Sequence, residues 1–167
     1  KKYDKKGKLQ DLESYDKGKR KSNNISLGIE LTEIKLDDGL YAKGILVKNI
    51  KNGLFKVYDS TNKEIYCNFY KNDTLVYKGR YDNLNKKTGK WLYYWPNGSV
   101  KKSGNYILNE KNKEWKYFFK NGLIQQKGNY VKNKPNGTWE WWYRSGQKRR
   151  VEDYENGKEK GFVFEYD

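Results

Sequence analysis

In the C-terminal two thirds of the chain, aromatic residues alternate with polar ones, and the alternation returns at a fixed step. Trp91, Trp115 and Trp139 lie 24 residues apart. Two further columns keep the same step, namely Gly98, Gly122 and Gly146, and Tyr106, Tyr130 and Tyr154. A constant step of this length is typical of a repeat array. We therefore expect regular repeats over residues 63–167, preceded by degenerate hairpin repeats over residues 1–62, in one continuous array.

Each repeat has the pattern of a β-hairpin. Aromatic and β-branched residues flank Asn97-Gly98, Asn121-Gly122 and Ser145-Gly146, dipeptides that favour a two-residue type I′ turn. Turns between repeats are expected at Asn136-Gly137 and Asn156-Gly157. No segment shows helical periodicity. The predicted fold is all-β, an elongated, open, MORN-like meander of antiparallel hairpins with about 24 residues per repeat.

One face of this meander is expected to form the core. A two-residue loop at 97–98 places Trp91 opposite Gly104, and the next hairpin places Trp115 opposite Gly128. An indole can lie across a neighbouring strand only where no Cβ blocks it. In the last hairpin Trp139 faces Glu152, so looser packing is expected there. The aromatic members of this face are Trp91, Tyr93, Trp95, Trp115, Tyr117, Phe119, Trp139, Trp141 and Tyr143, and nine adjacent rings are more typical of packing than of a ligand cage.

The opposite face is polar apart from a central ladder of rings. The ladder consists of Tyr94, Phe118 and Trp142, and the same register gives it the cross-strand partners Lys101, Gln125 and Arg149. Lys116 and Arg144 lie beside it. The sequence thus predicts a solvent-facing row of rings edged by cations, with the candidate partner-binding residues Tyr94, Lys101, Lys116, Phe118, Trp142, Arg144 and Arg149.

Composition excludes several classes of protein. The chain has 36 Lys+Arg and 21 Asp+Glu, a formal net charge of +15, one Cys and no His. Without His there is no Ser-His-Asp or Cys-His nucleophile and no His-ligated metal. Asp37-Asp38 precedes a glycine and is interpreted as a turn rather than a metal site. No phosphate-binding glycine loop is present. We expect no enzymatic activity, no catalytic residues, no metal, no cofactor and no transmembrane segment.

The pattern G-x-W-x-Y-Y-x-x-N-G followed by G-x-Y, seen from Gly89 to Tyr106, resembles the bacterial MORN-type repeat, in the variant found in YwqK-like antitoxins. The resemblance covers residues 64–166 well and residues 1–62 poorly. It implies an elongated hairpin meander without catalytic residues that is used for binding. Lys113 and Glu152 depart from the family pattern, which has Gly there. The segment Gly89–Tyr94 also resembles choline-binding repeats, but the 24-residue step and the G-x-Y strand argue against that family.

Two functional hypotheses follow. The first is a protein-binding module of the antitoxin, immunity or scaffold type, because the repeat builds a long surface and nothing reactive. The alternative is an exported cell-envelope or surface module that binds acidic glycan, lipid or host protein through rings and cations. A nucleic-acid partner is not expected, because Lys dominates the basic residues and they are spread along the chain. The sequence begins with Lys1 rather than Met, so we expect a trimmed N-terminus and favour an exported or cell-envelope location over the cytoplasm.

Overall fold

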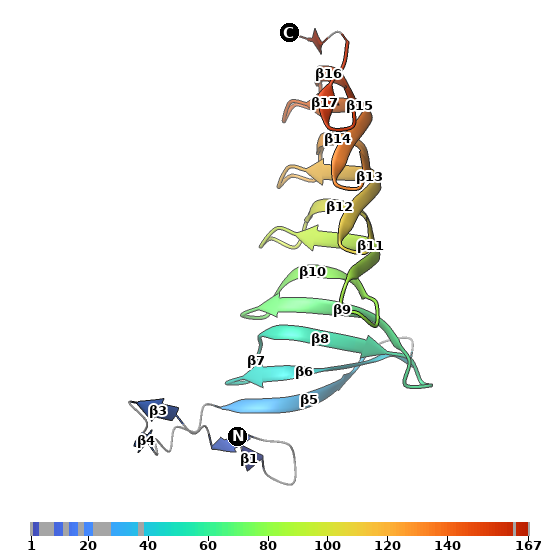
Figure 1. The fold of residues 1–167 in the computed structure, drawn as a ribbon. Helices are drawn as coiled ribbons and strands as arrows, with labels where there is room; N and C mark the ends of the chain where they lie inside the picture. The colour runs from blue at the N-terminus through green and yellow to red at the C-terminus, as the bar shows by residue number, and fades with distance from the viewer. Residues whose placement is uncertain are drawn as a thin grey trace. The chain divides into compact units, whose positions relative to one another are not determined.

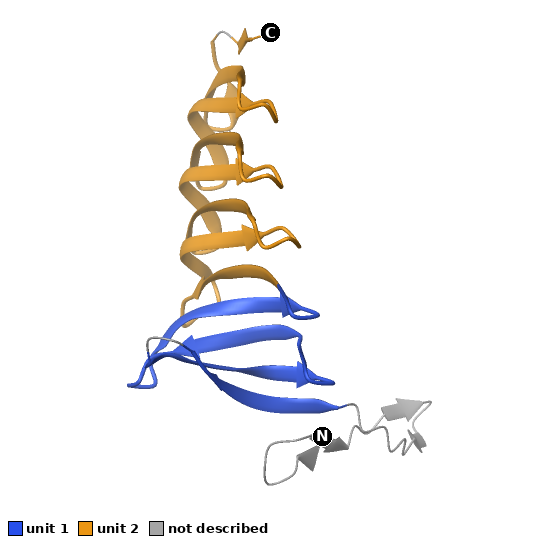
Figure 2. Cartoon of the chain, turned by 180° about the vertical axis from the view of Figure 1, so that it is seen from behind, with its two compact units in different colours: residues 1–74 blue, residues 75–167 orange. Residues whose placement is uncertain are grey.

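The computed structural model describes residues 28–36, 39–161 and 163–166, together with the backbone of four short strands nearer the N-terminus. Its regular elements are antiparallel β-strands, so the expected all-β array of hairpins is confirmed. Asp37-Asp38 lies outside the described residues. The chain divides into two compact units, Lys1–Thr74 and Leu75–Asp167 (Figure 2).

The N-terminal unit contains a meander sheet with a small hydrophobic core. Four short strands form two separate pairs, β1 with β2 and β3 with β4. In the sheet, β5, β6, β8 and β9 lie in this order, and β7 pairs with β6. Ala42, Phe55 and Val57 are buried at its centre. The strands are β1 (Lys2–Tyr3), β2 (Leu9–Asp11), β3 (Ser14–Asp16), β4 (Lys19–Lys21), β5 (Ile29–Lys35), β6 (Tyr41–Val47), β7 (Ile50–Lys51), β8 (Gly53–Tyr58) and β9 (Glu64–Lys71).

The C-terminal unit is the regular part of the repeat. Its strands follow one another in chain order from β10 to β17, and β18 also pairs with β16 (Figure 1). They are β10 (Thr74–Tyr81), β11 (Lys87–Tyr94), β12 (Val100–Ile107), β13 (Glu110–Phe118), β14 (Ile124–Val131), β15 (Lys134–Trp142), β16 (Lys148–Glu155), β17 (Lys158–Glu159) and β18 (Phe164–Glu165). Strands β12, β14 and β16 begin 24 residues apart, as the sequence step requires.

The turns within the hairpins differ from the expected type. A type I′ turn needs positive φ at both central residues, but at Asn97-Gly98 only the glycine has it, at 84°. The Gly98 amide donates to the Trp95 carbonyl at 2.9 Å, so Pro96 and Asn97 are the central residues and Gly98 follows them in the left-handed region. Proline is favoured at the first central position of such a type I turn. The predicted two-residue loop at 97–98 was therefore wrong, because the loop has three residues, Pro96, Asn97 and Gly98.

Among the regular repeats from β11 to β17, turns with the φ signs of type I′ lie between the repeats instead. Leu108-Asn109, Lys132-Asn133 and Asn156-Gly157 all have positive φ at both positions. The Asn109 side chain accepts a hydrogen bond from the Lys87 amide at 2.7 Å, and Asn133 repeats this contact with Lys111. The turn expected at Asn156-Gly157 is confirmed. The one expected at Asn136-Gly137 is wrong, because both residues lie inside β15.

Bulges bend the strands of every repeat. The register shifts between Tyr93 and Tyr94, and the same shift recurs in the two following hairpins. A second shift lies between Ser103 and Asn105 and recurs one repeat later. Because a bulge adds a residue to one strand, it increases local bending and twist. Figure 1 shows the resulting strong curl of the strands in this unit.

The second kind of shift, between neighbouring hairpins, places extra residues in the first strand of each hairpin, and one of these residues has positive φ. The residues there are Gly89, Lys113 and Gly137, with φ of 66°, 61° and 76°. Lys113 is exposed and has a side chain where its counterparts have none. The left-handed conformation costs a residue with a Cβ roughly 1–2 kcal/mol, which explains why glycine is the expected residue at this position.

We predict that Lys113→Gly stabilises the protein by about 0.5–1 kcal/mol, because the relief of backbone strain exceeds the entropy that glycine adds to the unfolded chain. Urea denaturation monitored by tryptophan fluorescence measures the change. Lys90→Gly is the matched control, since Lys90 is an exposed residue of β11 without positive φ. The control should lose about 0.5–1 kcal/mol, and a loss of stability in Lys113→Gly as well would contradict the strain argument.

The three indoles of the core fill space left by glycines. Trp91 and Trp115 are fully buried, and Trp139 is 3% exposed. The expected pairs Trp91–Gly104 and Trp115–Gly128 are present in the register. A Cβ on Gly104, however, would lie 2.2 Å from the ring of Trp115, not of Trp91. Each indole therefore lies over the glycine of the preceding hairpin, and the facing glycine leaves room for the next indole.

This offset corrects the expectation of loose packing at Trp139. The Trp139 ring lies over Gly128, and a Cβ on Gly128 would lie only 2.2 Å from that ring. The residue that faces Trp139 in the register, Glu152, therefore does not disturb its packing. The residue one repeat after Trp139 is Val163, so position 152 has no following indole to accommodate. Glu152 is buried there, pairs with Arg150 and accepts a hydrogen bond from the Tyr154 hydroxyl at 2.6 Å.

Candidate binding surface

A row of rings lies where the first strand of each hairpin runs into its turn. Trp95, Phe119 and Tyr143 directly follow β11, β13 and β15, and each begins a type I turn. The Trp95 indole N–H donates to the Phe118 carbonyl at 3.2 Å, which ties this ring to the next hairpin. These three residues were expected in the core. They are instead half-buried or, for Tyr143, 40% exposed, because the chain leaves the sheet at this point.

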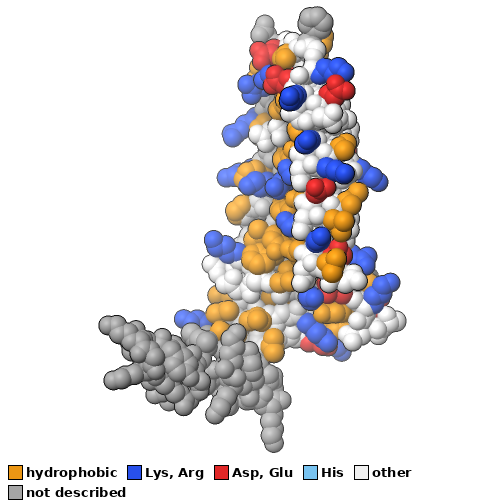
Figure 3. All heavy atoms as spheres, viewed as in Figure 1, with side chains coloured by type: hydrophobic (Ala, Val, Ile, Leu, Met, Phe, Trp, Pro, Cys, Tyr) orange, Lys and Arg blue, Asp and Glu red, His pale blue; other side chains and the backbone are white. Residues whose placement is uncertain are grey.

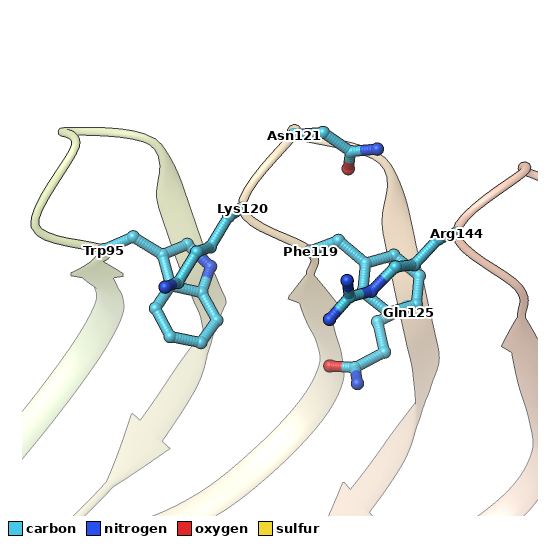
Figure 4. Close-up of a pocket in the computed structure, with 6 residues that line it drawn as sticks. All are labelled: Trp95, Phe119, Lys120, Asn121, Gln125 and Arg144. Carbon is cyan, nitrogen blue, oxygen red and sulfur yellow. The ribbon is translucent and has the colours of Figure 1, made fainter.

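Cations from two directions accompany these rings. The Nζ of Lys101 lies 4.4 Å from the centre of the Trp95 ring, and that of Lys120, from the following hairpin, lies 5.6 Å away. Figure 4 shows Lys120 directed towards Trp95 and Arg144 directed towards Phe119. The guanidinium carbons of Arg144 and Arg149 lie 5.8 Å from Phe119 and 5.6 Å from Tyr143. We call Trp95, Phe119, Tyr143, Lys101, Lys120, Arg144 and Arg149 the ring-and-cation row.

Two open cavities follow this row. The first, of ≈ 410 Å³, is lined by Trp95, Phe119, Lys120, Asn121, Gln125 and Arg144 (Figure 4). The second, also of ≈ 410 Å³, continues past Phe119 to Trp141, Tyr143 and Arg149. Among the described residues, no carboxylate lines either cavity. The space along the row is therefore bounded by rings, amides and cations, which favours a ligand that carries negative charge.

The predicted ladder of Tyr94, Phe118 and Trp142 has different partners. Because of the bulge, these residues face Val100, Ile124 and Lys148 rather than Lys101, Gln125 and Arg149. The expected pairing was wrong by one residue. Lys101 and Arg149 contact Trp95 and Tyr143 instead. The structure thus separates the candidate residues into two groups, with Lys101, Arg144 and Arg149 in the ring-and-cation row and Tyr94, Lys116, Phe118 and Trp142 outside it.

Carboxylates compensate part of the positive charge beside Trp142 and that of Lys116. Lys127 and Lys148 lie 5.5 and 5.9 Å from the Trp142 ring, but both also pair with Glu140, at 2.9 and 2.6 Å. Hydrogen bonds from Lys148 and Lys127 lower the pKa of the Glu140 carboxyl below its usual value. Lys116 pairs with Glu114 at 3.0 Å. This side of the sheet therefore has less unbalanced positive charge than the ring-and-cation row.

Further lysines contact the rings of the core. Lys102 lies 4.4 Å from the Tyr93 ring, and Lys111 contacts Trp115, Tyr117 and Tyr130. Burial lowers the pKa of Lys102, and its neighbours Lys111, Lys101 and Lys87 lower it further. Burial raises the pKa of Tyr130 to about 12.

Sequence reasoning assigned Trp95, Phe119 and Tyr143 to the core, and it placed Lys120 on the solvent face without including it among the candidate binding residues. The signal available was the place of the three rings next to the Pro-Asn-Gly, Lys-Asn-Gly and Arg-Ser-Gly turns, where a strand ends and the strict alternation of faces no longer applies. On the face drawn in Figure 3, Lys and Arg side chains recur between patches of apolar atoms. Within the described residues, no group of His, Cys, Asp and Glu could hold a metal ion. In the same part of the chain, no helix is long and apolar enough to cross a membrane.

An open meander of repeated hairpins, with a continuous row of side chains along its turns, is the architecture of a repeat-type binding protein. Residues 87–107 and 135–156 match the family described as "MORN repeat variant". These two stretches are therefore similar to MORN-type repeats, and proteins built from such repeats are in general non-catalytic binding modules.

Comparison with curated proteins found no match in sequence. Among solved structures, the chain is similar to a mutant of TarM from S. aureus, in complex with fondaparinux, alpha-GlcNAc-glycerol and UDP. The sequence identity is 16% and the TM-score is 0.32, and the match covers 64% of this chain and 21% of that one. The chain thus spans well under two thirds of that protein, and a likeness this low carries no argument about function.

Proposed function

We propose that this protein binds an acidic protein partner through the ring-and-cation row, as an antitoxin, an immunity protein or a scaffold would. The observation that carries the proposal is the positive charge of the row. Lys101, Lys120, Arg144 and Arg149 contact rings, and among the residues that the structure describes no carboxylate lines the cavities between them. Rings and arginines are also the residues that contribute most to protein interfaces.

A pull-down tests whether binding depends on this row or on the other basic residues of the surface. Full-length protein is immobilised and incubated with lysate and culture supernatant of the source organism, at low and moderate salt, and bound proteins are identified by mass spectrometry. We expect one acidic protein to remain bound at moderate salt, because a packed interface loses only part of its affinity when charges are screened. Arg144→Gln combined with Arg149→Gln should reduce its recovery by about tenfold or more.

Lys90→Gln combined with Lys116→Gln is the matched control, because it also removes two cations of the same unit. Both cations lie outside the ring-and-cation row, and Lys116 is already paired with Glu114. Recovery with the control should equal that of the unmodified protein. Equal loss in the control and in the arginine variant would show that the total charge, and not the row, attracts the partner.

The alternative function is an exported envelope module that binds acidic glycan or anionic lipid. The open cavities favour it, because half-exposed rings beside cations also suit the faces of charged sugars. In that case retention should disappear between low and moderate salt, as expected for binding dominated by screened charge. Recovery of polysaccharide or lipid alone, with no protein at moderate salt, would overturn the proposal of a protein partner.

A further inference from the structure

The spacing of the ring-and-cation row restricts the shape of its ligand. Trp95, Phe119 and Tyr143 come from alternate strands, β11, β13 and β15, of a sheet in which neighbours pair in chain order. Adjacent strands lie about 4.7–4.9 Å apart, so the strands that carry successive rings are about 9.6 Å apart. A linear ligand that crosses the hairpins must present similar groups at that period.

Only one common backbone conformation has this period. A polyproline II helix has three residues per turn and rises about 3.1 Å per residue, so it repeats every ~9.3 Å. An extended β-strand presents the same side every two residues, or ~6.7 Å, and every four residues, or ~13.4 Å. Two turns of an α-helix advance ~10.8 Å. From the strand of Trp95 to the strand of Tyr143 there are two such steps. Over them the repeat of an α-helix differs from the strand spacing by ~2.4 Å, whereas the repeat of polyproline II differs by only ~0.6 Å.

Side-chain chemistry agrees with such a ligand. Aromatic rings in a groove are the usual contacts of polyproline II segments, which lose little entropy on binding because the helix is already formed. Lys120 and Arg144 lie over the rings of the preceding repeat (Figure 4), so a cation recurs at the period of the rings. Arginine can bind a carboxylate with two parallel hydrogen bonds. The groups that recur along the ligand are therefore a ring-contacting residue and a carboxylate.

We propose that the ring-and-cation row binds an acidic polyproline II segment of a partner protein, with one turn of the ligand per hairpin. Proline side chains contact Trp95, Phe119 and Tyr143, and an Asp or Glu at every third position lies against Lys120 and Arg144. This inference rests on the proposed function, since it specifies the part of the acidic partner that the row recognises. It differs from simple charge attraction because it demands a fixed spacing of three residues.

Two synthetic peptides of equal composition test the spacing. One is (Pro-Pro-Glu) repeated four times. The other has the same eight prolines and four glutamates, with the glutamates placed in pairs at its two ends. Calorimetric titration of the full-length protein at moderate salt should give a dissociation constant at least about tenfold lower for the regular peptide. Equal affinity for both peptides, or binding of neither, would overturn the inference.

Protein variants and a third probe complete the test. Arg144→Gln, which changes an exposed side chain, should weaken binding of the regular peptide by about tenfold, and Trp95→Phe should weaken it less than Trp95→Ala. Lys90→Gln, an exposed cation outside the row, should leave it unchanged. Polygalacturonate carries carboxylates on a sugar chain, and tighter binding of this probe than of the regular peptide would assign the row to acidic glycans instead.

The peptide experiment can fail while the proposed function stands. If a lysate protein depends on Arg144 and Arg149 but neither peptide binds, the row recognises a folded acidic surface and the polyproline II inference is wrong. If the arginine substitutions leave every captured protein in place, the row is not the binding surface, and the proposed function itself is wrong.

Discussion

Replacement of Trp115 by alanine is expected to destabilise the C-terminal unit by about 3–5 kcal/mol, the usual cost of deleting a buried large aromatic ring. Trp115 is fully buried and meets Tyr106 and Tyr130 edge-on, with ring centres 5.0 and 6.2 Å away. Its indole N–H donates to the Asn105 carbonyl at 3.1 Å. The substitution therefore removes packing on both sides and leaves that carbonyl without the indole donor.

Urea denaturation followed by circular dichroism measures this loss, and hydrogen exchange locates it. Each repeat of an array contacts chiefly its neighbours, so protection should fall first in β12, β13 and β14. Trp142→Ala is the matched control, because Trp142 is half-buried and its ring is edged by Lys127 and Lys148. A harmless Trp115→Ala together with an unfolded Trp142→Ala would show that the two faces of the sheet are assigned the wrong way round.

Gly104→Ala is expected to be nearly as damaging, although it adds only one methyl group. The new Cβ would lie 2.2 Å from the Trp115 ring, which is fully buried. Overpacking of a well-packed core typically costs about 1–3 kcal/mol and occasionally more, and a clash this close places the loss at about 3 kcal/mol. Thermal denaturation of the full-length protein provides the measurement.

The control for Gly104 is a glycine with a different role. Gly122 has φ of 88° and no neighbouring atom within 4 Å of an added Cβ. Asparagine tolerates the left-handed region, so Gly122→Asn should cost less than about 1 kcal/mol. The offset between glycine and indole is tested by combining variants, since Gly104→Ala should cost little when Trp115 is already alanine. If Gly104→Ala instead became harmless only in combination with Trp91→Ala, then Trp91, which faces Gly104 in the register, would be the indole that needs the glycine.

These two predictions depend on information of different kinds. The burial of Trp115 follows from alternation along a strand, which the aromatic pattern already shows. The clash at Gly104 does not, because the register pairs Gly104 with Trp91 while the ring above it belongs to the next hairpin. Side chains lean across a strongly bent sheet, and no property of the sequence alone specifies the direction in which they lean.

The candidate surface illustrates the same division. Arg144, Lys101 and Arg149 were recognisable as basic residues close to rings, but the rings assigned to them were Tyr94, Phe118 and Trp142. One extra residue in each bulge moves Lys101 and Arg149 to the neighbouring ring, Trp95 or Tyr143. The segment Val100–Lys102, where this bulge lies, has no glycine that would mark it. In the other bulge of the repeat a glycine is expected, and at Lys113 even that glycine is missing.

The sequence by itself determined the fold class, the 24-residue repeat, the pairing of Trp91 with Gly104 and the burial of the three indoles. Those features depend on local periodicity and on turn residues, which each hairpin carries within its own segment. Only the tertiary structure decided which glycine makes room for which indole, which turns are type I′, and which cations meet which rings. Those features depend on bulges and on contacts between successive hairpins, where a shift of a single residue changes every side-chain partner.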